Sequence, residues 1–69
     1  MNKIPRFITE YANYEKRLVE SNELMTNINK AAAIGNINAA IRLYKYGFIT
    51  VSESIRLINQ ACESEVDKQ

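Results

Sequence analysis

The chain has 69 residues, nine of them basic and eight acidic, which gives a formal net charge of +1. This length allows a single domain with one core, and the balanced charge excludes a strong general attraction to nucleic acid or anionic lipid. With no histidine and one cysteine, Cys62, the sequence also excludes an intramolecular disulfide and a histidine-based metal site.

The first predicted helix covers residues 5–20. Pro5 suits a first helical turn, where a backbone N–H has no helical partner in any case. Apolar residues then recur at intervals of three and four, the helical period. They are Ile4, Phe7, Ile8, Tyr11, Tyr14, Leu18 and Val19. Ser21 and Asn22 follow, and they predict either the end of this helix or the cap of the next one.

The middle segment, residues 23–46, has a helical composition and two apolar stripes. The first stripe is Ile34, Ile37, Ile41 and Tyr44, and the second is Ile28, Ala32, Ala39, Leu43 and Tyr46. A single helix with both stripes would be buried nearly all round, or shared between its own core and a partner.

Two interpretations of the middle segment differ at Gly35 and Asn36. A break there would give two short helices, because glycine costs about 1 kcal/mol inside a helix and Gly-Asn is a common turn pair. One long helix, straight or kinked, is favoured by the four-residue spacing of Ala31, Gly35 and Ala39. That spacing lines small side chains along one face and lets another helix approach closely.

The clearest local signal follows the middle segment. Gly47 predicts a left-handed C-cap, and the run from Thr50 to Glu53 predicts a capping box for the next helix. The helical period continues to Cys62, so we predict a third helix over residues 51–62 and a frayed polar end over 63–69. The expected architecture is one all-α domain, residues 1–69: a three-helix bundle, or a four-helix bundle if the middle segment breaks.

The sequence gives little support to enzymatic chemistry. Without histidine, acid–base or nucleophilic work would need a pocket that shifts the pKa of a carboxylate, lysine, tyrosine or thiol, and so small a core has little room for one. Cys62 lies on the apolar stripe of its helix, which favours a small buried apolar residue over a reactive thiol. We therefore expect no catalytic, cofactor-binding or metal-binding residues, and a protein that acts by binding a macromolecule.

The expected partner is a protein: a second copy of the chain, a host protein, or both. Small chains without disulfides or metals commonly gain stability from a partner subunit. Tyr14 and Tyr46 exceed the needs of a small core and favour an interface, whereas Phe7, Tyr11, Tyr44 and Phe48 are predicted to lie in the core. The candidate partner-binding residues are Tyr14, Ile34, Ile37, Ile41, Tyr44 and Tyr46.

The alternative partner is DNA. Arg42, Lys45 and Arg56 lie near the predicted turn and would contact phosphates in this interpretation. Two or three phosphate contacts give only weak, salt-sensitive binding, so a solvated basic face is the simpler account. The polar N-terminal residues give no signal peptide or membrane span, and the lone thiol suits a reducing cytoplasm, so a cytoplasmic protein without membrane contact is expected.

Residues 43–55, with a glycine after a helix, an Ile-Thr pair and an acidic residue at the next helix start, resemble the core of the SHOCT-type helical hairpin. This resemblance covers under a third of the chain, departs where the family is richer in charge, and implies an oligomerising or partner-binding hairpin. The same segment resembles the opening of helix-turn-helix antitoxin-like proteins, but no second turn and recognition helix follow Ile58. As a whole the chain is similar in style to small phage and conjugative-element proteins of Gram-positive bacteria, which implies a regulator or inhibitor.

Overall fold

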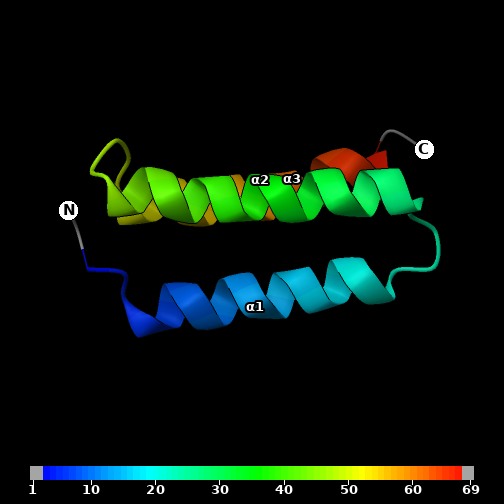
Figure 1. Cartoon of the computed structure of the whole chain (residues 1–69), viewed down its shortest axis with the longest axis horizontal. Coiled ribbons are helices and arrows are strands. Elements are labelled where there is room, and N and C mark those ends of the chain that lie inside the picture. The colour runs from blue at the N-terminus through cyan, green and yellow to red at the C-terminus, as the bar shows by residue number, and fades with distance from the viewer. Residues whose placement is uncertain (1–2, 68–69) are drawn as a thin grey trace.

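The computed structural model describes the backbone of residues 3–67 and the side chains of residues 3–62. It contains three α-helices, α1 (Arg6–Ser21), α2 (Asn27–Lys45) and α3 (Val51–Asp67), and the described residues include no strand. The helices alternate in direction: α2 and α3 lie side by side in one layer, and α1 forms the other (Figure 1). The all-α, three-helix class predicted from the sequence is the class that the structure has.

One isoleucine and one alanine from each helix form the centre of the bundle. Ile8, Ile37 and Ile58 are completely buried, and Ala12, Ala40 and Ala61 complete the same cluster. The alanines let the helices approach closely, and the isoleucines fill the space between them. A second cluster, made by Val19, Met25 and Ala33, lies toward the α1–α2 loop.

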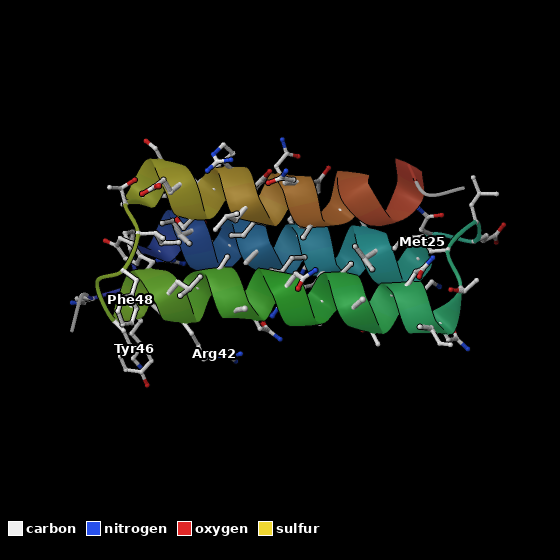
Figure 2. The ribbon with its side chains drawn as sticks, turned by 90° about the horizontal axis from the view of Figure 1, so that it is seen from above. Met25, Arg42, Tyr46 and Phe48 are labelled. Carbon is white, nitrogen blue, oxygen red and sulfur yellow. The ribbon has the colours of Figure 1, made fainter. Side chains whose placement is uncertain are left out.

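The α1–α2 connection corrects the predicted start of the middle helix, which is Asn27 and not Glu23. Asn22 ends α1, and its side-chain oxygen accepts a hydrogen bond of 2.8 Å from the backbone N–H of Leu24. Thr26 caps α2 by accepting 3.1 Å from the N–H of Asn29. The buried side chain of Met25 anchors the loop at the end of the bundle (Figure 2). Asn22 is therefore the C-cap of α1, and Thr26 is the N-cap of α2.

The α2–α3 connection has the local structure that its residues predict. Gly47 has a φ of 85°, and its N–H donates to the carbonyl of Tyr44 at 3.0 Å while the N–H of Phe48 donates to Leu43 at 2.9 Å. This is the Schellman arrangement. Thr50 and Glu53 then form a reciprocal capping box, with backbone N–H to side-chain oxygen distances of 3.1 and 3.2 Å. The two motifs together reverse the chain and set α3 antiparallel to α2.

Two further features of the helices can be compared with the sequence predictions: the continuity of α2 at Gly35 and the C-terminal end of α3. Helix α2 passes through Gly35 and Asn36 without a break, so the version with two short helices is not what the structure has. Helix α3 continues to Asp67 and does not end near Cys62. Residues 63–67 are mostly polar but contain no glycine or proline to stop the helix, and polarity alone does not end one.

Candidate protein-interaction surfaces

The two apolar stripes of α2 face opposite sides, and the first one faces the core. Ile37 has no exposed surface, and Ile34, Ile41 and Tyr44 are partly buried. The expectation that this stripe contacts a partner is therefore wrong for Ile37, which no partner can reach. The physical reason is that three isoleucines on neighbouring turns of the first stripe bury their side chains in or against the two core clusters, whereas the middle of the second stripe has only alanine and glycine to bury.

The second stripe is left on the surface. We call Ile28, Ala32, Gly35, Ala39, Leu43 and Tyr46 the outer face of α2. Ile28 is 81% exposed, Tyr46 55% and Leu43 39%, while Ala32 and Gly35 are also exposed. A Cβ atom added at Gly35 would meet nothing within 4 Å. Among the described residues, the predicted close approach of another helix therefore does not occur at Gly35.

The outer face also lacks charge. Residues 31–41 contain no charged side chain, although helices at a protein surface ordinarily carry charged or polar residues toward water. Toward α3 the face continues into an open groove of about 320 Å³. The groove is lined by Asn36, Ala39, Ala40, Leu43, Leu57, Gln60 and Ala61. The apolar surface of α2 thus spreads onto the neighbouring helix.

Two aromatic side chains extend the outer face at the C-terminal end of α2. Tyr46 and Phe48 project from this end on the same flank as Arg42 (Figure 2), and Phe48 is 74% exposed. The prediction of Phe48 as a core residue is wrong. Phe48 follows the left-handed Gly47 in the Schellman turn, and this position favours packing over the last helical turn at the surface. Tyr46 is exposed, as the sequence suggests.

Helix α1 carries a second exposed stripe, formed by Phe7, Tyr14 and Leu18 beside the partly buried Tyr11. The helix buries Ile8, Ala12 and Val19 instead. The apolar residues of α1 therefore span a wider face than the core covers. The prediction that Phe7 lies in the core is wrong. Tyr14 is exposed, in line with its predicted place outside the core.

The three basic residues of the DNA-binding interpretation are all exposed: Arg42, Lys45 and Arg56. Arg42 and Lys45 occupy the last turn of α2, where a positive charge stabilises the helix dipole without any ligand. Helices α2 and α3 lie antiparallel and side by side in Figure 2, and in Figure 1 α3 lies behind α2. A helix-turn-helix instead joins its two helices at about 90–120°, so this pair does not have that geometry.

No family model, curated protein or solved structure matches this chain. The surfaces of the molecule are therefore the features from which a function can be inferred. On the outer face of α2 and its extension at Phe48 lie three exposed large apolar residues that were not among the predicted partner-binding residues: Ile28, Leu43 and Phe48. The sequence signal for Ile28 and Leu43 was present in the second stripe, but periodicity alone does not say which stripe faces outward.

No cluster of three or more histidine, cysteine or acidic side chains that could hold a metal occurs among the described residues. Cys62 is partly buried and packs against both core clusters, as a small apolar residue does. Within the same part of the chain, no helix combines the length and apolar character that crossing a membrane requires.

Proposed function

We propose that this protein is a non-enzymatic interaction protein that binds another protein through the outer face of α2. The observation that carries the proposal is the exposure of large apolar side chains along a helix whose middle, residues 31–41, has no charged side chain. Ile28, Leu43, Tyr46 and Phe48 together expose on the order of 500 Å², taking about 200 Å² for a large side chain. Patches of about 300–600 Å² are the largest on typical monomers and often mark an interaction site.

The shape of the surface favours a helix as the binding element. With 19 residues, α2 is about 28 Å long, and its outer face is a convex strip rather than an enclosed pocket of the kind that holds a small molecule. Ala32, Gly35 and Ala39 occupy the middle of the strip, where their size allows a partner backbone to come close. Ile28 and Leu43 lie toward its two ends, where their side chains can make apolar contacts with the partner.

In this proposal the α2–α3 hairpin supplies the binding helix, and the resemblance of residues 43–55 to the SHOCT-type hairpin points to the same kind of role. A cytoplasmic regulator or inhibitor from a phage or mobile element is the biological setting that we propose. DNA binding is the competing function, and the outer face offers it little, since residues 31–41 bring no positive charge to a phosphate.

Site-specific photo-crosslinking in the producing cells tests the proposal. A benzoylphenylalanine at position 28 should give a discrete protein adduct, because Ile28 is the most exposed large apolar residue of the outer face. The matched control places the same group at Asn13, an exposed position on α1. Equal adducts from both positions, or none from position 28, would contradict the proposal.

A gel-shift assay at two salt concentrations tests the competing function. Binding of duplex DNA that weakens steeply with salt, and that Arg42→Ala with Lys45→Ala abolishes, would favour the DNA-binding regulator instead. Retention of the crosslink together with no shift would favour protein binding. The two assays therefore separate the two classes of partner.

A further inference from the structure

We propose that the outer face of α2 binds the same face of a second copy of the chain, with the two α2 helices antiparallel and a twofold axis beside Gly35. This inference rests on the proposed function and names its partner. It replaces the dimer expected through Ile34, Ile37, Ile41 and Tyr44, because Ile37 is part of the core and Ile34 and Ile41 pack against the core of their own chain.

The order of side-chain sizes along the outer face is self-complementary. Ile28 lies seven residues before Gly35 and Leu43 eight residues after it, or about 11 and 12 Å along the helix. Ala32 and Ala39 lie three and four residues from Gly35 on its two sides. A twofold axis at this point sets Ile28 of one copy opposite Leu43 of the other and small residues opposite small ones. Twofold interfaces of this kind use one patch twice.

Gly35 lies where the two helices would cross. Among the described residues, an added Cβ would meet nothing within 4 Å, so no described contact inside the bundle requires the lack of a side chain at Gly35. At a helix crossing, the same lack lets two backbones approach closely. The packing of the monomer thus does not depend on this glycine, whereas the packing of the proposed dimer would.

The charges of α2 select the antiparallel direction. The helix carries Lys30, Arg42 and Lys45 and no acidic residue. A parallel pair would set Arg42 and Lys45 beside the same residues of the other copy, and like charges in register oppose association. The antiparallel pair instead brings this end toward the partner's α1–α2 loop, where Glu23 is exposed. These charges favour the antiparallel orientation over the parallel one.

The available area sets the strength of the dimer. The exposed large apolar side chains supply on the order of 500 Å² per copy, less than the about 800 Å² per partner of a standard stable interface. We therefore expect a reversible dimer whose population rises between micromolar and millimolar concentration, and not an obligate one.

Sedimentation equilibrium of the wild-type chain and of Gly35→Gln tests the contact. The variant should raise the dimer dissociation constant at least tenfold, because its side chain occupies the crossing point. It should not unfold the monomer, since the site is open and glutamine is the better helix former. Asn13→Gln on α1 is the matched control and should leave association unchanged. A dimer that tolerates Gly35→Gln would overturn the proposal.

Disulfide trapping in a Cys62→Ala background tests the orientation. A mixture of Ile28→Cys and Leu43→Cys chains should form the mixed disulfide, because the axis sets these positions opposite each other. Ile28→Cys alone should not crosslink, since its two copies lie about 21 Å apart along the helices. A dominant Ile28 homodimer would show a parallel pair, and the absence of the mixed disulfide would reject this register.

The experiments distinguish a failure of the dimer proposal from a failure of the proposed protein-binding function. A strict monomer at all concentrations, combined with a position-28 photo-adduct to a different protein, would reject the second copy and keep the interaction function. A monomer without any position-28 adduct would reject both. An adduct of twice the chain mass would support the dimer in the cell.

Discussion

The same substitution at the two glycines should change stability in opposite directions. Gly35 lies inside α2 with open space around an added Cβ, so Gly35→Ala gains the helix propensity of alanine, about 1 kcal/mol, without overpacking. Gly47 has a φ of 85°, and an L-residue in this left-handed conformation costs about 1–2 kcal/mol. We expect the two variants to differ by about 2–3 kcal/mol in unfolding free energy.

Each variant is the control for the other, because the two chains have identical composition and mass. Thermal and urea melts followed by far-UV circular dichroism measure the difference, at the lowest protein concentration that gives a signal so that dimerisation does not contribute. For a domain of this size, 1 kcal/mol shifts the melting temperature by about 4–8 °C. Changes of the same sign in both variants would refute the reasoning, and a loss of more than about 1 kcal/mol in Gly35→Ala would refute the open surface site.

Three further substitutions test the core, the cap and the outer face. Ile37→Asp should unfold the chain, because it places a charge at a completely buried position; a folded monomer on size exclusion would contradict this. Thr50→Ala should cost about 1 kcal/mol by removing the cap that accepts from the N–H of Glu53, and a denaturant midpoint equal to that of wild type would contradict it. Ile28→Ser should change monomer stability by less than about 0.5 kcal/mol yet weaken dimerisation, because the side chain is exposed; a large loss in the melt at low concentration would show that Ile28 is part of the core.

The α2–α3 connection could be predicted from the sequence almost residue by residue, and the α1–α2 connection could not. Gly47, Thr50 and Glu53 act through contacts within a few residues, so their pattern specifies the turn by itself. Ser21 and Asn22 predict either the end of the first helix or the cap of the next, whereas in the structure Asn22 ends α1 and Thr26 caps α2. The sequence shows which residues can cap a helix, whereas the buried position of Met25 between them depends on the packed bundle.

The sequence showed that α2 has two apolar stripes, and only the packed bundle shows which one faces inward. Ile28 and Ile37 are nine residues apart, which places them on opposite sides of a helix with 3.6 residues per turn. The choice between them depends on α1 and α3. The same limit explains Phe7 and Phe48: their hydrophobicity suggests a core, but Ala12, Ala40 and Ala61 draw the helices together and leave little room for rings.

The unequal packing of the three helices has a consequence for partial unfolding. Helix α3 packs most extensively against α2, and α1 packs least against α3. Between α1 and α2, two lysine amines donate hydrogen bonds: Lys16 to Asn38 at 3.0 Å and Lys30 to the carbonyl of Glu20 at 2.8 Å. Both are side-chain contacts near the surface, so we expect α1 to open first as a separate cooperative unit.

Native-state hydrogen exchange should then find the amides of α1 less protected than those of the α2–α3 hairpin. Opening of α1 uncovers Ile37 but not Ile28, which lies on the opposite side of α2. A partner bound at the outer face would therefore slow exchange in α2 and α3 while leaving the exchange of α1 unchanged. Helix α1 would therefore be able to unfold transiently on one side of α2 while a partner stays bound on the other side.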